Sequence, residues 1–295
     1  MTTFSATPNV QASSDTLEQV RRARQGLLVF AVFLIPLSVF GYWFNIKYPE
    51  LPLILPTLPL MFAPGLASIL TRLLRREGFA DVSFRFRGNR MRSAILLAFG
   101  LPLVVGTIAY SFAYLTGLAQ FDPPPFPVAA GSPLAQFALI MAFAGTVAVL
   151  ISLPTTAGEE IGWRGYLLPR MIEARIPQPI MLTSLIWGTW HLPIVFAGVF
   201  ATSSSHLISA VGLMVSTLAL GYILARLRLT TGSVWPAIFG HAAWNAFING
   251  GFTFVTQNRT DNIWIGETGI VVSATLILAA VVISRIWKPA EVVNG

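Results

Sequence analysis

Residues 176–225 read IPQPIMLTSLIWGTWHLPIVFAGVFATSSSHLISAVGLMVSTLALGYILA and contain no Asp, Glu, Lys or Arg. This stretch is too long for one membrane-spanning helix, which needs about 20 mostly apolar residues, but it suits two. The polar run at 201–206 is the natural turn between them. The stretch therefore predicts two consecutive membrane spans, at 179–200 and 207–225.

The composition of the whole chain also indicates a protein embedded in lipid. The chain has 295 residues, of which 55% are hydrophobic and 11% are charged, and its mean hydropathy is +0.70. About a quarter of the residues of a soluble domain are charged. Further uncharged runs predict six more spans. We therefore predict an all-α, polytopic transmembrane bundle of about eight helices, with the remaining spans at 25–46, 51–71, 93–118, 134–153, 234–254 and 263–284.

The distribution of basic residues orients this bundle. All of the 19 Lys and Arg residues except Lys47 and Arg259 fall on the side of the N-terminus. By the positive-inside rule, both termini are then cytoplasmic. The net charge of +7 reflects topology and contact with the lipid bilayer, not nucleic acid. The predicted divisions are a polar tail at 1–24, the bundle at 25–288 and a tail at 289–295, with the first apolar segment retained as an anchor.

Several chemistries are excluded by residue type. The chain has no cysteine, so it has no disulfide, thiolate nucleophile or Cys-ligated metal. It also lacks the HExxH pattern of soluble zinc proteases, the GxSxG pattern of serine hydrolases and a pair of intramembrane aspartates. A metal would need Asp, Glu or His ligands, and only three histidines are present.

Ionisable groups inside membrane segments are costly and mark candidate functional sites. Glu159 and Glu160 follow the predicted fourth span, where Pro154 and Gly158 suggest a kink or a helix end. On a helix, Glu160 and Arg164 share a face and can pair, whereas Glu159 is turned about 100° away. Taken alone, the cluster is better explained as an ordinary group of interfacial charges.

Two histidines lie within later spans. His191 lies about twelve residues into the predicted fifth span. His241 and Asn245 are i and i+4 in the seventh and share a face. Each feature alone is compatible with a polar contact between helices. Together with the two glutamates, they fall at depths that one cavity open to the cytoplasm can collect.

This set of side chains suits peptide hydrolysis. A carboxylate and a neutral imidazole can hold and deprotonate a water molecule. A second histidine and an amide can donate hydrogen bonds to an oxyanion. The same carboxylate and imidazole groups could instead hold a zinc ion whose bound water is the nucleophile. The residues alone do not choose between these two mechanisms.

Three motifs, in this order, resemble those of the CAAX protease and bacteriocin-processing (CPBP) family. They are Glu159-Glu160-x-x-x-Arg164, an aromatic-x-x-x-His motif at Trp187–His191, and His241-x-x-x-Asn245. The family includes the Ras-converting CAAX endopeptidase and bacterial abortive-infection-type membrane proteins. The resemblance covers roughly residues 130–255, and it departs from the usual pattern in having Trp187 where phenylalanine is common.

The resemblance implies an intramembrane endopeptidase with specific roles for these residues. Glu159 with His191 would activate the water, and His241 with Asn245 would stabilise the oxyanion. Glu160 and Arg164 would organise the site or bind the carboxylate end of the substrate. Family members are described as metalloproteases, while a metal-free glutamate mechanism is also proposed for the eukaryotic branch. If zinc were used, its candidate ligands would be Glu159, His191 and His241.

Other functions stay open on the sequence. The substrate would be a membrane-associated protein or peptide, such as a prenylated CAAX protein or a peptide precursor. A non-catalytic membrane scaffold or bacteriocin-immunity factor of the same fold is the alternative. A proton-relaying transporter ranks last, because the two halves show no repeat. We expect a prokaryotic plasma membrane. Glu267 is expected near the outer end of the eighth span, where it can reach the interface.

Overall fold

The computed structural model describes residues 9–52, 54–87, 89–126, 128, 131–200, 203–257 and 261–287. This part of the chain is all-helical, with one isolated bridge between Phe121 and Thr256 and no strand. Its helical segments form eight continuous helices, as predicted. Those made of a single segment are α1 (Asn9–Lys47), α2 (Ile54–Arg75), α3 (Asn89–Leu115), α7 (Pro179–Phe196), α8 (His206–Thr231) and α10 (Ile270–Ile286).

Two of the eight helices contain π-helical segments. The first comprises α4 (Pro133–Phe143), η1 (Ala144–Ala148), α5 (Val149–Gly162), η2 (Trp163–Leu167) and α6 (Leu168–Glu173). The second joins α9 (Trp235–Trp244) to η3 (Asn245–Thr253). Short π-helical segments inside α-helices are rare and occur frequently at functional sites. Here η2 begins directly after α5, which carries Glu159 and Glu160, and η3 begins at Asn245.

The predicted end of the fourth span at Leu153 is wrong. The helix continues through Pro154 and Gly158 to Glu173. Pro154 is exposed on the outside of the bundle, and membrane helices tolerate proline. α1 begins at Asn9, so the helix extends N-terminally of the predicted span at 25–46. Arg21 and Arg22 pair with Glu18 in this extension and support the helix. The predicted tail at 289–295 lies outside the described residues.

Within the described residues, six helices are long and apolar enough to cross a membrane. The helix formed by α9 and η3, and the shorter apolar helix α10, occupy the places of the predicted seventh and eighth spans. Large apolar side chains such as Leu28, Leu96 and Ile286 are exposed on the outside of the bundle. Water would oppose such a surface, whereas lipid favours it. The chain is thus an integral, multi-pass membrane protein.

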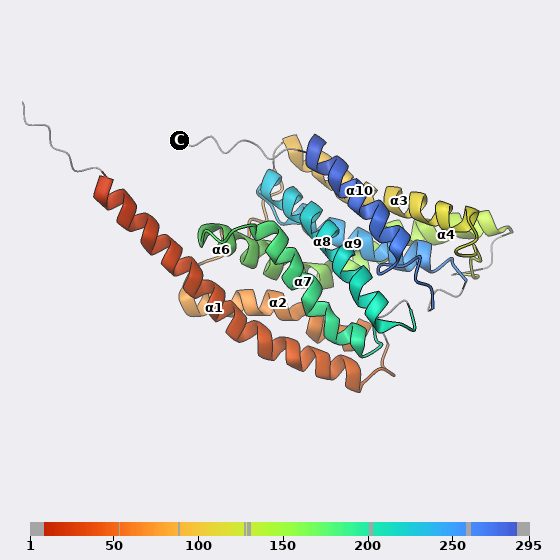
Figure 1. The fold of residues 1–295 in the computed structure, drawn as a ribbon, viewed down its shortest axis with the longest axis horizontal. Helices are drawn as coiled ribbons and strands as arrows, with labels where there is room; N and C mark the ends of the chain where they lie inside the picture. Colours follow the sequence, from red (N-terminus) through yellow and green to blue (C-terminus); the bar gives the residue numbers. More distant parts are fainter. Residues whose placement is uncertain are drawn as a thin grey trace, which may run out of the picture.

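The bundle has α1 and α2 along one edge and α3 and α10 along the opposite one (Figure 1). Between these edges lie α7, α8 and α9, and α5 contacts both α2 and α9. The largest side chains of the interior include Trp163, Trp187 and Trp244. This arrangement brings α5, α7 and α9, which carry the candidate site residues, together inside the bundle.

Glycines allow α2 to approach α5 backbone to backbone. A Cβ atom on Gly65 would lie 2.5 Å from the carbonyl oxygen of Gly158, and one on Gly162 would lie 2.4 Å from Cβ of Pro64. Small residues permit such close contact between membrane helices. The neighbouring atoms here belong to backbone or to a rigid ring, so they have little freedom to give way.

Gly65→Ala is therefore expected to destabilise the bundle, by about 1–3 kcal/mol for overpacking. Gly100→Ala is the matched control, because a Cβ there meets nothing within 4 Å. That variant should be neutral or gain up to about 1 kcal/mol from helix propensity. The measurement is the temperature at which each purified variant leaves the monodisperse gel-filtration peak. Equal midpoints for the two variants would contradict the packing argument.

Candidate active site

Two adjacent carboxylates are completely enclosed in the interior. Glu159 and Glu160 are 1% and 0% exposed, and so is Arg164 at 0%. The pairing predicted from the i, i+4 spacing is present, because Arg164 Nη1 donates to Glu160 Oε1 over 2.8 Å. Solvent barely reaches the three side chains in the described part of the chain. The helix does not end before these residues, and it holds them inside the bundle.

His241 joins this pair from α9. Its Nδ1 lies 3.0 Å from Glu160 Oε1, the oxygen that also accepts from Arg164. The imidazole is 4% exposed. Glu160 therefore lies between a guanidinium and an imidazole, and it is the carboxylate in direct contact with His241.

Trp187 of α7 connects the members of the site. Its indole Nε1 donates to Glu159 Oε2 over 2.8 Å. The guanidinium of Arg164 lies over the same ring, 4.5 Å from its centroid, and the His241 ring meets it edge-on at 5.1 Å. The sequence identified this position only as the aromatic residue of a motif. The one available signal was that its family pattern calls for an aromatic residue four positions before His191.

His191 lies one turn further along α7 and is half-buried. Its Nδ1 is 2.9 Å from the carbonyl oxygen of Trp187. A carbonyl only accepts, so Nδ1 carries the proton and Nε2 is left as an acceptor when the ring is neutral. The ring packs against Trp187, Trp190 and Phe200. His191 thus contacts the site through Trp187, and its hydrogen bond goes to the backbone.

Asn245 follows His241 by one turn, at the start of η3, and is half-buried. Within the described residues its side chain makes no hydrogen bond. The structure therefore brings Glu159, Glu160, Arg164 and His241 together around Trp187. His191 and Asn245 are neighbours along the same helices, and their side chains are not bonded to that group.

The expected zinc ligands do not form a metal-binding group. No three His, Asp or Glu side chains of the described residues lie close enough to hold a metal ion. Glu159 accepts from an indole N–H, and His241 directs Nδ1 at Glu160. These contacts engage one oxygen of Glu159 and only Nδ1 of each histidine. A histidine that binds zinc through Nε2 commonly donates its Nδ1–H to a carboxylate or a backbone carbonyl. The donor chemistry of Glu159, His191 and His241 therefore suits zinc, although the described structure does not gather the three side chains around one point.

Several polar atoms of the site lack a partner within the described residues. They are Glu160 Oε2 and the Nε and Nη2 atoms of Arg164. Buried polar groups without hydrogen bonds are rare and costly. These atoms therefore call for water or for the polar groups of a bound molecule, and the two free guanidinium nitrogens suit an anionic oxygen.

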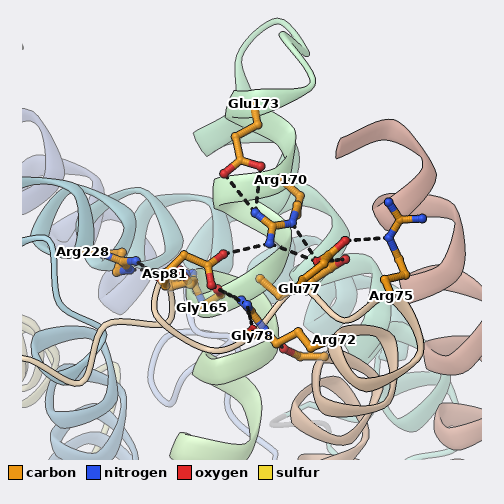
Figure 2. A network of polar contacts seen from close by, with 12 residues as sticks. Arg72, Arg75, Glu77, Gly78, Asp81, Gly165, Arg170, Glu173 and Arg228 are labelled. Carbon is orange, nitrogen blue, oxygen red and sulfur yellow. Dashed lines mark hydrogen bonds and ion pairs between the residues drawn. The ribbon is translucent and has the colours of Figure 1, made fainter. Parts of the chain in front are cut away.

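A second polar cluster lies beside the site and holds η2 in place (Figure 2). Arg72 donates to the carbonyl of Gly165 over 2.9 Å, and Arg228 donates to the carbonyl of Arg164 over 3.1 Å. The other ends of both arginines meet Asp81, through an ion pair with Arg72 and a 2.6 Å hydrogen bond from Arg228 to its carbonyl. Arg170 extends the cluster to Glu77 and Glu173. The loop after α2 is thereby tied to the backbone that carries Arg164.

The two loop carboxylates of this cluster titrate below their usual range. Burial opposes the ionisation of Glu77, but Arg75 and Arg170 outweigh it and lower its pKa from the ordinary 4.5. Burial likewise opposes ionisation of Asp81, and Arg72 with Arg170 lowers its pKa from the ordinary 3.8. The folded protein therefore binds fewer protons than the unfolded chain in this range. The stabilisation is complete above pH 4.5 and is lost as the pH falls through the lowered values.

The expected outcome is acid destabilisation that depends on these two groups. In wild-type protein, the thermal midpoint should fall between pH 6 and pH values of about 3.5. E77Q/D81N should start from a lower midpoint at pH 6 and lose less on acidification. Glu50→Gln is the control, since Glu50 is exposed in the loop after α1. A pH slope in E77Q/D81N equal to that of the control would contradict this assignment.

Glu267 is a buried carboxylate whose predicted position was wrong. It precedes α10 in a non-helical segment, is 8% exposed, and accepts from Trp244 Nε1 over 3.1 Å and Asn249 Nδ2 over 2.9 Å. It therefore does not reach the interface. The predicted helix start at 263 failed because Gly266 has a positive φ of 81°, and Gly269 approaches the Ile265 carbonyl too closely for a Cβ atom.

The fold and the buried acid–imidazole cluster define a multi-pass membrane protein with a polar site inside its helical bundle. Residues 131–247 match the family model of type II CAAX prenyl endopeptidases, described as Rce1-like. The match contains all six candidate residues and confirms the resemblance to the CAAX protease family. The family implies a protease and suggests CAAX intramembrane endopeptidase activity. No curated protein matches the chain.

Proposed function

We propose that the protein is an intramembrane endopeptidase that hydrolyses a peptide bond of a membrane-anchored protein or peptide through a glutamate-activated water. The observation that carries this proposal is the convergence of three helices on one buried group. Glu159 and Glu160 come from α5, Trp187 from α7 and His241 from α9. Enclosing two carboxylates in a membrane bundle is energetically costly, and such groups therefore mark a functional site.

Glu159 is the proposed general base. Trp187 holds its Oε2, and its Oε1 has no hydrogen-bond donor among the described residues. Oε1 can therefore bind a water and take its proton while the water oxygen attacks the carbonyl carbon. The same carboxyl group then returns the proton to the leaving amine. His191 assists, because its Nδ1–H is engaged by the Trp187 carbonyl and its Nε2 can accept a hydrogen bond from that water.

His241 is the proposed stabiliser of the oxyanion. Glu160 accepts from Nδ1 and holds the ring in place, so that Nε2 is left free and, in the protonated ring, its N–H can donate to the developing negative charge. Arg164 balances the charge of Glu160. Asn245, one turn beyond His241 and without a hydrogen bond to another described residue, can supply a second donor. Preorganised donors of this kind contribute roughly 10²–10³-fold to the rate each.

Arg164 also supports a preference for substrates cleaved near a carboxylate. Its Nε and Nη2 atoms have no acceptor within the described residues. They can form the two parallel hydrogen bonds that an arginine makes with a carboxylate. CAAX-type processing and maturation of a short peptide both place a C-terminal carboxylate near the scissile bond, so both fit the proposed function.

The test is a comparison of protein C-termini by mass spectrometry in cells that express the wild type, Glu159→Ala or the exposed control Glu50→Ala. A defined set of membrane-protein termini trimmed by the wild type and the control, and left intact by Glu159→Ala, would identify the substrates. Identical termini in all three, at equal expression, would refute the proposal. The completely enclosed site would then be better explained by a non-catalytic scaffold or immunity factor.

A further inference from the structure

The loop between α2 and α3 contains a segment in which aromatic and basic residues alternate. It reads Phe84-Arg85-Phe86-Arg87, and we call it the Phe/Arg segment. All four residues are exposed, with Phe84 at 47% and Phe86 at 59%. Two exposed phenylalanines that alternate with two cations suit neither water nor a hydrocarbon interior. They suit the boundary between the two.

The arginines of this segment differ from those nearby. Arg72, Arg75, Arg170 and Arg228 all bind carboxylates or carbonyl groups. Within the described part of the chain, Arg85 and Arg87 have no such partner, nor does Arg92 at the start of α3. These cations are therefore available to an external anion. Arginine forms bidentate hydrogen bonds with phosphate in particular.

The position of the segment matches the edge of a membrane. It follows the end of α2 at Arg75 and precedes the start of α3 at Asn89, and both helices are candidate spans. The Phe84 ring packs against Trp235 at 5.9 Å, and the Trp235 Nε1 donates to the Phe84 carbonyl over 3.1 Å. Rings gathered at the ends of spans are typical of the membrane interface.

We propose that the Phe/Arg segment binds the surface of an anionic phospholipid membrane. Phe84 and Phe86 enter the boundary between headgroups and acyl chains, and Arg85 and Arg87 bind lipid phosphates. Charge complementarity and the place of the segment at the ends of two spans favour a lipid surface over an acidic protein segment. The acidic segment is an alternative outcome of the test.

The segment is connected both to the helix that carries His241 and to the π-helical segment η2 that carries Arg164. The preceding Ser83 accepts at its carbonyl from the Val234 N–H, where the helix of His241 begins. Asp81 is held by Arg72 and Arg228, which also bind the carbonyls of Gly165 and Arg164. Anchoring the segment to lipid therefore also immobilises the π-helical segment η2. Anionic lipid is expected to order the site as well as the loop.

The experiment is hydrogen exchange measured by mass spectrometry on the full chain in nanodiscs. One set of discs contains phosphatidylcholine alone and the other contains phosphatidylglycerol in addition. The wild type is compared with R85Q/R87Q and with R85K/R87K, which keeps the charges. R21Q/R22Q removes equal charge from α1, where both arginines pair with Glu18. This readout does not need peptidase activity, so it stands independently of the proposed function.

Phosphatidylglycerol is expected to slow exchange at 79–87 and at 163–167 in the wild type, in R85K/R87K and in R21Q/R22Q. One arginine near an anionic surface changes such an equilibrium by about fivefold, so R85Q/R87Q should lose roughly 30-fold of protection. Salt at 0.5 M should likewise weaken the protection by phosphatidylglycerol in the wild type, R85K/R87K and R21Q/R22Q, because it screens exposed charges. Equal exchange in both kinds of disc would overturn the proposal. Protection by an added poly-glutamate peptide, and none by phosphatidylglycerol, would assign the segment to an acidic protein partner instead.

Discussion

Glu159→Gln is expected to lower the turnover number by roughly 10²–10⁴-fold, the usual contribution of a positioned general base. The substitution keeps the size of the side chain, and the amide oxygen can still accept from Trp187 Nε1. What it removes is the ability to take a proton from water. The KM should change little, because the proposed contacts to a substrate carboxylate belong to Arg164. The rate is to be measured in detergent or nanodiscs on a substrate found by the C-terminal comparison.

Glu50→Gln serves as the control for this measurement, because it changes an exposed carboxylate of the same type. Both variants should elute from gel filtration as the wild type does, and both should keep its thermal midpoint within about 2 °C. A Glu159→Gln enzyme that retains a tenth or more of the wild-type rate would remove Glu159 from the role of base. The other carboxylate, Glu160, would then be the group to test.

Arg164→Met is expected to destabilise the fold by about 3–5 kcal/mol, because it leaves Glu160 buried without its cation. Glu160 and Arg164 are both 0% exposed, so bulk solvent does not screen the charge that is left. Methionine replaces the length of the arginine side chain and still packs under Trp187. The thermal midpoint of the purified protein should fall by roughly 6 °C or more.

The double variant E160Q/R164M separates charge from packing. It removes both members of the pair, so most of the lost stability should return while catalysis remains lost. Arg175→Met changes a cation of the loop after α6 and should leave the midpoint unchanged. If R164M and E160Q/R164M unfold at the same temperature, the damage comes from the altered packing and not from an unpaired carboxylate.

Much of the architecture follows from the sequence, because lipid leaves a helix few alternatives. Uncharged runs indicated eight helices, and the structure has them in the part of the chain that it describes. Predicted helix boundaries were wrong where the packing of the bundle overrides a local sequence rule. Pro154 ends or bends a helix in water, yet α5 continues through it on the exposed, lipid-facing side of the bundle. The predicted start of α10 was too early, because the residues around Gly266 are apolar like a helix and yet form a loop.

The candidate site was predictable to the level of a helix face. The i, i+4 spacing gave the pairing of Glu160 with Arg164, because this contact is local. Spacing cannot say which neighbouring helix lies opposite each face. The contact of His241 with Glu160, and the central position of Trp187, therefore needed the arrangement of α5, α7 and α9 in space. The support of η2 by Arg72 and Arg228 comes from distant parts of the sequence and has no local signal.

The contacts of α2 with the helix that carries the glutamates determine where the bundle can open. Gly65 contacts Gly158, and Arg72 contacts Gly165. The two contacts are separated by the same number of residues on both helices. They run in the same direction and are held at one end by touching backbone and at the other by a hydrogen bond. Such a pair moves as a rigid body. In the proposed peptidase, a substrate would then reach Glu159 by a displacement of α7 or α9 relative to this pair. A cross-link between α2 and α5 should therefore leave the bundle able to open.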